Sequence, residues 1–317
     1  MRVPGLFRRT RWFLVPLLST LLVTAVPSPV SAIVLPDREV APGEALWTAA
    51  ITEDFGVIDG QSIGRQHVCT GVLVKPRVVL TAAHCVYDSE RPDTWRVRVG
   101  HHTNRAREGV QRSVVAVVFH GLYERGLVQL IDGVETPMKG GLRGDERDFD
   151  GDIALVLLDK AVTTIRPISL PSTSRYVPTL SWRTYGWGLT GDEEDVQTDR
   201  LLTAAQDDYT EQYAESSGET FRHVYAATRF LDEVVSGTCW GDSGGPLVDG
   251  SGTLIGLTSW ADAELCSEPV PTLFTRVASH LTWIDAANRR ASDLAQQAKR
   301  KAQRSKTKPV VHVVSYE

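Results

Sequence analysis

From Trp47 onward, short apolar runs alternate with clusters of Gly, Pro and Asp. The runs are rich in Val, Leu, Ile and Thr, and they include GVLVKPRVVLTAA, WRVRVG, RSVVAVVFH, DIALVLLD, WRTYGWG and TLIGLTSW. Runs of this length that alternate with a period of two, or that are wholly apolar, are typical of β-strands. We therefore predict an all-β body with many turns.

One segment interrupts this pattern near the middle of the chain. Residues 166–178, RPISLPSTSRYVP, combine three prolines with several hydroxyl side chains. Such a composition disfavours regular structure and is typical of a connection. We interpret it as the link between two similar halves, about 33–165 and 179–280.

The pattern changes again near the C-terminal end. Apolar residues at Leu281, Ile284 and Ala287, with Trp283 alongside, have helical spacing and predict a helix that packs on the body. Beyond Asn288 the apolar pattern fades, so we expect residues 289–317 to form a solvated basic extension, with contact to an anionic cell-wall or surface polymer as the alternative. The last stretch, PVVHVVSYE, is compatible with an edge strand, but the sequence does not decide this.

The N-terminal residues predict export. Residues 1–32 consist of a basic stretch, MRVPGLFRRTR, an apolar stretch, WFLVPLLSTLLVTAV, and the small residues PSPVSA. This is the pattern of a signal peptide that is cleaved after Ala32. The alternative, an uncleaved anchor, is disfavoured because the apolar run is shorter than the ~20 residues of a spanning helix. We expect a secreted protein with no membrane span after cleavage.

Composition narrows the class of protein. The chain has 317 residues, of which 42% are hydrophobic and 23% charged, so it can bury a full core. A net charge of -5 and a pI near 5.9 give no general attraction to nucleic acid, and no Gly-rich phosphate loop is present. We therefore expect no nucleic-acid partner.

Export makes disulfides possible for the four cysteines. Four cysteines allow three pairings, and spacing favours the local bridges Cys69–Cys85 and Cys239–Cys266. The alternative is a zinc site, which prefers closely spaced Cys or His pairs, and the chain has no C-x-x-C motif.

Three short motifs carry candidate chemistry. Ser243 lies in SGTCWGDSGGP, His84 in LTAAHC after an apolar run, and Asp152 in DGDIALVLL at the start of another. A serine hydroxyl becomes a strong nucleophile only with a nearby base, a group that orients the base, and donors for the oxyanion. Taken singly, the three residues are equally compatible with a turn serine, a core histidine and a strand-end cap.

Together with Ser259-Trp260, these motifs resemble the trypsin-like (chymotrypsin-fold) serine proteases, in the family's order of His, Asp and Ser. The resemblance covers Ile33 to about Ala287. It implies an all-β fold of two six-stranded antiparallel β-barrels with the active site between them and a C-terminal helix, in a protease domain at 33–288. It also implies a secreted endopeptidase, which we expect to be bacterial and monomeric, to act on protein or peptide substrates, and to use no cofactor or metal.

The resemblance assigns a role to each site residue. Ser243 attacks the scissile carbonyl, His84 is the general base and then acid, and Asp152 orients the imidazole. The backbone N–H groups of Gly241 and Ser243 form the oxyanion hole. Ser259 supports Asp152, and the strand from Ser259 to Ala261 pairs with the extended substrate.

In this family a new N-terminus, usually IVGG, inserts and pairs with the acid before the nucleophile. Signal cleavage after Ala32 exposes Ile33, so we expect its amine to pair with Asp242. The chain departs from the pattern at Leu35-Pro36, where two glycines usually allow the chain to turn.

The resemblance also identifies the residues of the primary specificity pocket. Gly237 stands where trypsin itself has an acid, so a Lys or Arg side chain would lack a partner there. Ala261 and Thr272 narrow the pocket, and we expect a preference for small or medium aliphatic residues, with aromatic residues as the alternative. Asp262 and Glu264 are close enough in sequence to recruit a basic residue instead. Thr238, Trp240 and Trp260 complete the expected lining.

Further features concern access, metals and other classes of function. The segment between His120 and Asp152 is unusually long and should border the cleft, as should the acidic loop 190–199. His101-His102 and the basic loop after them give no reason to expect metal or calcium. The alternatives to a protease are a catalytically silent binding protein of the same fold and an esterase with the same triad.

Overall fold

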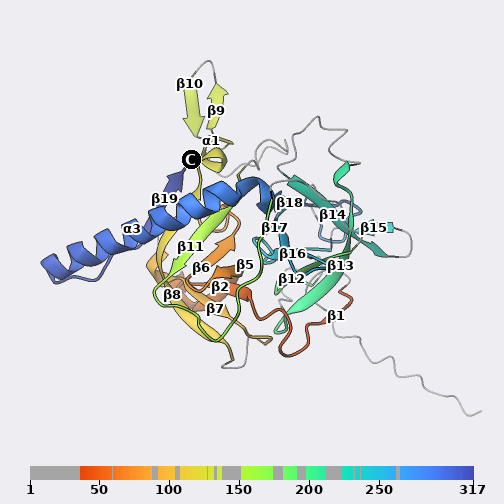
Figure 1. Ribbon diagram of the computed structural model, residues 1–317, viewed down its shortest axis with the longest axis horizontal. Helices are drawn as coiled ribbons and strands as arrows, with labels where there is room; N and C mark the ends of the chain where they lie inside the picture. Colours follow the sequence, from red (N-terminus) through yellow and green to blue (C-terminus); the bar gives the residue numbers. More distant parts are fainter. Residues whose placement is uncertain are drawn as a thin grey trace, which may run out of the picture.

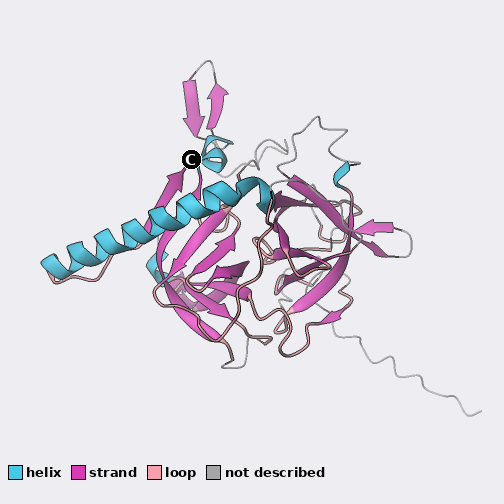
Figure 2. Cartoon of the chain, viewed as in Figure 1, coloured by secondary structure: helices cyan, strands magenta, loops and turns pink. Residues whose placement is uncertain are grey.

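The computed structural model describes residues 36–58, 60–87, 92–103, 108–126, 128–131, 134–137, 151–173, 181–190, 198–211, 223–230, 233–235, 237–261 and 265–317. This part of the chain consists mainly of strands, with one long helix, α3, lying across them (Figures 1 and 2). The predicted signal peptide, 1–32, and the expected new N-terminus at Ile33 lie outside the described residues.

The first barrel has six strands in the order β11-β6-β5-β2-β7-β8, and β8 closes it by pairing with β11. All of these pairs are antiparallel. Its strands are β2 (Thr48–Asp54), β5 (Arg65–Lys75), β6 (Val78–Thr81), β7 (Arg96–Val99), β8 (Val110–His120) and β11 (Ala154–Leu158).

The second barrel has the order β13-β12-β16-β17-β18-β14 and closes through β13 and β14, again antiparallel throughout. Its strands are β12 (Trp182–Gly186), β13 (Leu202–Asp208), β14 (His223–Phe230), β16 (Pro246–Asp249), β17 (Leu254–Trp260) and β18 (Thr272–Arg276). The predicted fold, two six-stranded antiparallel barrels and a C-terminal helix, is thereby confirmed.

Short elements are added to this frame. They are β1 (Arg38–Glu39) on β13, β15 (Glu233–Val235) on β14, the pairs β3 (Val57–Ile58) with β4 (Gln61–Ser62) and β9 (Val128–Ile131) with β10 (Val134–Pro137), and the helical turns η1 (Pro92–Thr94), α1 (Gly121–Gly126) and η3 (Val277–His280).

Strand β11 shows why some runs are wholly apolar. Its alternate residues Ala154 and Val156 belong to the core inside the first barrel. Leu155 and Leu157 belong to a second core, which also contains buried residues of the second barrel and of α3. Because successive side chains of a strand point to opposite faces, a strand buried on both faces must be apolar at every position.

The C-terminal helix is longer than expected. Helix α3 spans Leu281–Ser305, so the prediction that the helix fades after Asn288 and gives way to a solvated extension is wrong. Beyond Asn288 the buried stripe continues at helical spacing through Ala291, Leu294, Ala298 and Ala302. These are mostly alanines, which give a weak hydrophobic signal, while the basic residues of the same stretch lie on the exposed face.

The last residues form strand β19 (His312–Tyr316), which resolves the open question about PVVHVVSYE. β19 pairs in parallel with β8, from His312 opposite Ala116 to Tyr316 opposite His120. Within the described residues, no helix is both long and apolar enough to cross a membrane.

Candidate active site

Asp152 and His84 meet because their strands are neighbours. His84 follows β6 and Asp152 precedes β11, and β6 and β11 pair with Ala154 opposite Thr81. Asp152 is completely buried. Its Oδ2 lies 2.8 Å from His84 Nδ1, and its Oδ1 accepts a hydrogen bond from the His84 backbone N–H at 2.9 Å. Together the two contacts fix the imidazole relative to the carboxylate.

The second barrel also holds Asp152. Ser259 at the end of β17 donates a 2.6 Å hydrogen bond to Asp152 Oδ2, in agreement with the sequence analysis. Thr275 on β18 donates from its hydroxyl to the Asp152 backbone oxygen at 2.8 Å. Sequence analysis missed Thr275, because a threonine in a buried strand carries no signal for this contact. The acid of one barrel is therefore held by hydroxyls of the other.

The pKa values of the pair shift in opposite directions. Burial alone would lower the pKa of His84, but the charge of Asp152 and its hydrogen bond outweigh burial and raise it. Burial alone would raise the pKa of Asp152, but His84 and the hydrogen bond from Ser259 lower it. The geometry therefore favours an ionised Asp152 beside an imidazole that accepts a proton readily.

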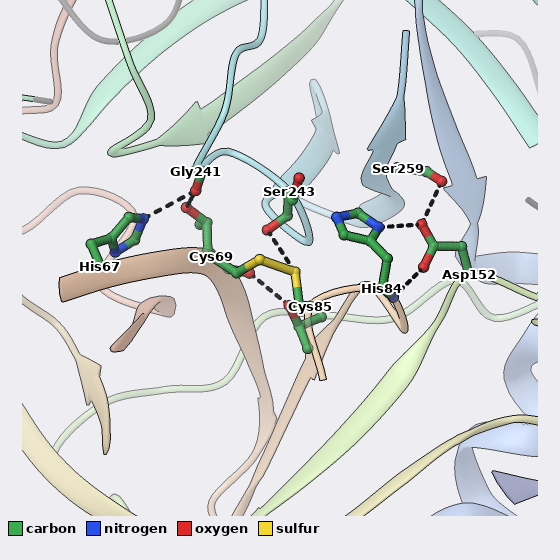
Figure 3. Close-up of a disulfide and its surroundings, with 10 residues drawn as sticks. His67, Cys69, His84, Cys85, Asp152, Gly241, Ser243 and Ser259 are labelled. Carbon is green, nitrogen blue, oxygen red and sulfur yellow. Dashed lines mark hydrogen bonds and ion pairs between the residues drawn. A yellow bond between two sulfur atoms is a disulfide. The ribbon is translucent and has the colours of Figure 1, made fainter. Parts of the chain in front are cut away.

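Ser243 lies in the turn before β16, on the far side of the His84 ring from Asp152 (Figure 3). Its backbone oxygen accepts a 2.9 Å hydrogen bond from the N–H of Thr70 in the first barrel. Among the described residues, Ser243 Oγ makes no hydrogen bond to His84, and in unliganded enzymes such contacts are often long. The ring is nevertheless placed between the hydroxyl and the carboxylate.

Two backbone donors lie next to the Ser243 side chain. Gly241 has a φ of +95°, a conformation that favours glycine. Its carbonyl oxygen accepts hydrogen bonds from His67 Nε2 at 3.0 Å and Thr70 Oγ1 at 2.9 Å. The N–H groups of Gly241 and Ser243 donate to no acceptor within the described residues.

His67 is a residue that the sequence analysis missed. It lies on β5, 174 residues before Gly241, and nothing in its local sequence points to that contact. Burial lowers the pKa of His67 to about 4, although the Gly241 carbonyl partly opposes this. The ring is therefore neutral near pH 7, with its one proton on Nε2 to donate to the Gly241 carbonyl.

Asp242 is the second fully buried carboxylate of the site. Among the described residues, it accepts hydrogen bonds from two backbone N–H groups alone, from Gly188 at 2.8 Å and from Cys239 at 3.0 Å. Burial raises its pKa to about 7, although both N–H groups oppose this. No cation of the described residues pairs with it, and Ile33 lies outside them.

Two glycines that the sequence analysis did not single out surround this carboxylate. A Cβ atom at Gly186 or Gly188 would overlap the Asp242 side chain. The YGWG motif therefore leaves the space that the carboxylate occupies.

The residues expected to line the specificity pocket come from two segments. The hydroxyls of Thr238 and Thr272, both buried, lie 2.8 Å apart and join these segments. Gly237 has a φ of +73°, and a Cβ there would overlap the Thr228 hydroxyl. Trp240 is 54% exposed. Trp260 and Ala261 are half-buried.

Asp262 and Glu264, the acids considered for a basic substrate residue, lie outside the described residues, as do most of the long segment before Asp152 and loop 191–197.

The four cysteines form two disulfides, Cys69–Cys85 and Cys239–Cys266, the pairing that their spacing favoured. They are therefore not available as thiolate zinc ligands.

Of the histidine pair His101-His102, His101 is buried and its ring stacks on the Trp187 ring at a centroid distance of 4.5 Å. His102 Nε2 lies 3.1 Å from the Glu44 backbone oxygen. Both imidazole rings thus contact other parts of the protein, His101 through stacking and His102 through a backbone oxygen.

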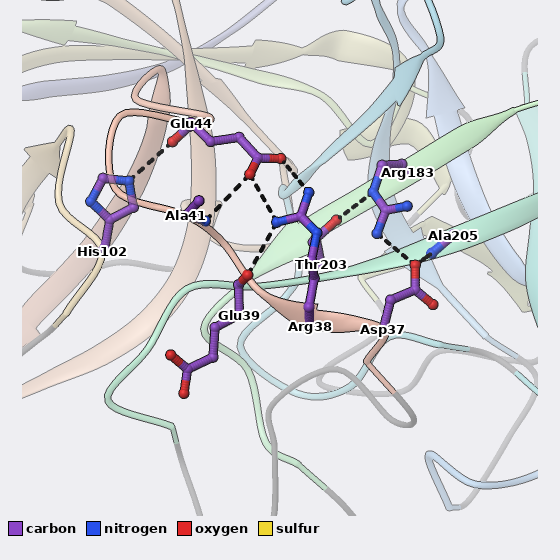
Figure 4. A network of polar contacts seen from close by, with 9 residues as sticks. All are labelled: Asp37, Arg38, Glu39, Ala41, Glu44, His102, Arg183, Thr203 and Ala205. Carbon is purple, nitrogen blue, oxygen red and sulfur yellow. Dashed lines mark hydrogen bonds and ion pairs between the residues drawn. The ribbon is translucent and has the colours of Figure 1, made fainter.

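The start of the described chain is anchored on the second barrel (Figure 4). Asp37 bonds to Arg183 and to the N–H of Ala205, and Arg38 makes two hydrogen bonds to Glu44. β1 pairs with β13, and β13 with β12, so that Glu39 and Gly186 both lie opposite Leu202. Two strand spacings, about 10 Å, therefore separate Glu39 from the glycine beside Asp242.

Comparisons with known proteins agree with this architecture. The profile of the family described as Trypsin matches residues 37–284. Human transmembrane protease serine 5 is 29% identical over 274 residues, which cover 81% of this chain and 52% of that protein. Mouse atrial natriuretic peptide-converting enzyme is 28% identical over 266 residues, or 80% and 21% of the two chains. The chain thus spans about half the length of the first relative and about a fifth of the second.

Solved structures give the same picture. Neuropsin, a serine protease expressed in the limbic system of mouse brain, matches with a TM-score of 0.57 and 26% identity, covering 78% of this chain and 97% of that one. Human heparin binding protein has the same fold, with a TM-score of 0.60 at 23% identity and coverage of 80% and 96%.

Proposed function

The chain belongs to the trypsin family of serine endopeptidases, and we propose that Ser243, His84 and Asp152 are its catalytic triad. The observation that carries this proposal is the fully buried Asp152, which is held by the ring and backbone of His84 and by Ser259. A buried carboxylate is costly unless it is paired, and this one is paired with the imidazole that faces Ser243.

In the proposed reaction, Asp152 accepts a hydrogen bond from the Nδ1–H group of His84. This holds the proton on Nδ1 and leaves Nε2 as the basic nitrogen. Nε2 takes the hydroxyl proton of Ser243 as the oxygen attacks the scissile carbonyl. The N–H groups of Gly241 and Ser243 stabilise the oxyanion, and His67 and Thr70 hold the Gly241 peptide in place for this role. His84 then protonates the leaving amine, and water releases the acyl group by the reverse sequence of proton transfers.

The proposed preference before the scissile bond is for small or medium aliphatic residues. The buried hydrogen bond between Thr238 and Thr272 supports it, because two threonine side chains fill space that glycines at these positions would leave open. Gly237 offers no acid to a Lys or Arg side chain. A Thr272→Gly variant should gain cleavage after Phe or Tyr while keeping cleavage after Ala. Unchanged selectivity would count against this account of the pocket.

For activation, the proposed step is insertion of the Ile33 amine beside Asp242. A carboxylate buried with only two N–H donors, and with a pKa near 7, is stabilised by a cation. The six Cα–Cα steps from Ile33 to Glu39 span at most about 20 Å, twice the roughly 10 Å that separates Glu39 from Gly186. Adding one residue before Ile33 should abolish most activity, whereas undiminished turnover would contradict the proposal.

Cleavage of residues 1–32 is proposed to export the enzyme and to expose Ile33 in one event. Contact of the basic face of α3 with an anionic surface polymer is a further proposal, supported by the exposure of Lys299, Arg300 and Lys301.

The test of the proposed function is digestion of a diverse peptide library, read by mass spectrometry, with Ser243→Ala as control. Cleavage by the wild type alone, together with labelling of Ser243 by a serine-directed phosphonate, is the expected result. Labelling without peptide cleavage would indicate an esterase. Absence of both, in protein that starts at Ile33, would indicate a binding protein.

A further inference from the structure

The chain passes from β8 into α1 at His120–Tyr123, a turn that we call the corner, and the two residues beside Asp152 pack against it. The His120 N–H donates to the Ile153 carbonyl at 3.0 Å. Gly151 packs so closely on the corner that a Cβ there would lie 2.9 Å from Leu122 Cβ and 3.0 Å from His120 Nδ1. Both residues that flank Asp152 therefore rest on this corner.

The last residues of the described chain also pack against the corner. Tyr316 is opposite His120 in the parallel ladder of β19 and β8. A Cβ at Gly121 would lie 3.1 Å from Glu317 Cγ and 3.7 Å from the Tyr316 carbonyl carbon. Figure 1 shows β19 and the C-terminus beside α1, which begins at Gly121. The segment His312–Glu317 thus packs against the corner.

Helix α3 fixes this segment in turn. Trp283, in the first turn of α3, donates from its indole N–H to the Tyr316 carbonyl at 2.8 Å. Its ring lies 5.2 Å from the His120 ring, so Trp283 contacts both the segment and the corner. The Lys75–Asp285 ion pair at 2.7 Å ties the same end of α3 to the first barrel without touching β19.

We propose that the segment His312–Glu317 is a positioning element for Asp152, and that Trp283 holds the segment in place. This inference rests on the proposed role of Asp152 as the orienting acid. The contacts of Asp152 with His84 and Ser259 are short and directional, and a displacement of about 1 Å at such a group can cost up to ~10²-fold in rate. Support from the corner limits such displacement.

A purely structural role is the competing explanation, since an added strand also covers an open edge of β8. The two roles differ in what they change. Loss of a structural strand lowers the melting temperature or the fraction of active molecules. Loss of a positioning element lowers kcat of each active molecule and leaves KM for a short substrate nearly unchanged.

The first experiment removes the segment from protein that has already folded. A recognition sequence for a site-specific protease is inserted between Thr307 and Lys308, in the exposed turn after α3, and the purified protein is cut. Gel filtration with mass spectrometry verifies that the released peptide is gone. Active molecules are counted by phosphonate labelling, and kcat and KM are measured with a short ester substrate.

We expect kcat per labelled site to fall about tenfold, with KM changed by less than about twofold. A synthetic peptide of residues 309–317 should restore kcat. The same peptide with both Val313 and Val314 replaced by proline should not, because it cannot form the ladder with β8. Unchanged kcat per labelled site after complete removal would overturn the proposal.

The second experiment keeps the chain whole, and it decides the matter if the cut protein unfolds or retains the peptide. Trp283→Phe removes the N–H donor and keeps an aromatic ring, and it should lower kcat about threefold. Lys75→Met loosens the same helix as a matched control and should leave kcat unchanged. Equal kcat for Trp283→Phe and wild type, or equal losses in both variants, would contradict positioning. Failure of the proposed function is distinguishable, because the intact chain would then neither label nor turn over.

Discussion

Asp152 and Asp242 are both fully buried, and they flank the same nucleophile from two sides, yet their pKa values move in opposite directions. Burial acts on both in the same way and raises the pKa. Asp152 accepts hydrogen bonds from an imidazole, a hydroxyl and a backbone N–H, and its pKa falls. Within the part of the chain that the structure describes, Asp242 accepts hydrogen bonds from two backbone N–H groups alone, and its pKa rises to about 7.

The difference shows what a buried carboxylate needs. Two amide dipoles are insufficient to keep Asp242 fully ionised at neutral pH, whereas a group that can carry positive charge keeps Asp152 ionised. Asp152 has its partner in the folded barrels. Asp242 packs against Gly186 and Gly188 and has no such partner among the described residues, and in the proposed activation step the Ile33 amine takes that place.

The largest expected effect comes from Asp152→Asn, which keeps the shape and removes the charge. The amide would stabilise the wrong tautomer of His84, so kcat should fall about 10⁴-fold, measured per folded molecule with a short ester substrate. Asp285→Asn, on an exposed acid of α3, is the control and should retain activity. A loss of less than about tenfold for Asp152→Asn would mean that His84 does not depend on this carboxylate.

Asp242→Asn should have the next largest effect in protein that starts at Ile33. It removes one partner of the proposed ion pair, and breaking a buried pair costs about 3–5 kcal/mol, which corresponds to a loss of roughly 10²- to 5 × 10³-fold in activity. The measurement is phosphonate labelling rate together with kcat/KM. If the variant keeps full activity, the Ile33 amine does not act through this carboxylate.

Before cleavage, when the Ile33 amine is not available, Asp242 should make the folded protein less stable as the pH rises. In a chain that begins upstream of Ile33, the folded state binds a proton on Asp242 up to about pH 7, whereas the unfolded state releases it near 3.8. The free energy of unfolding should therefore decrease as pH rises from about 4 to 7, by up to about 4 kcal/mol. Urea unfolding at several pH values tests this. Asp242→Asn should flatten the slope, and a slope that persists in the variant would assign it to other groups.

Some features of the fold and of the site could be predicted from the sequence, and others could not. The two barrels could be predicted, because strand periodicity is local and the motifs around His84, Asp152 and Ser243 are short and ordered. His67, Thr275 and Gly186 could not, because each acts across 50 to 180 residues of chain through a common residue type. The second half of α3 was missed for a related reason, since Ala291, Ala298 and Ala302 are buried by packing that local hydropathy barely records.

The smallest expected effect comes from removing one of the hydrogen-bond donors of Asp152. Ser259→Ala removes the 2.6 Å hydrogen bond to Oδ2, and hydrogen bonds to charged groups contribute about 1.5–3 kcal/mol, of which only a part acts on catalysis. We expect kcat to fall by about three- to tenfold. The remaining negative charge on Asp152 then acts more strongly on His84, whose pKa should rise further.

In the wild type, kcat/KM should increase with pH through a pKa above 6.5, because the base is neutral His84 and Asp152 raises its pKa. In Ser259→Ala this midpoint should move to still higher pH. Ser251→Ala, in an exposed turn, should change neither kcat nor the midpoint. A midpoint that moves to lower pH in Ser259→Ala would mean that Asp152 has left His84, and that the hydroxyl of the second barrel positions the acid rather than only sharing its charge.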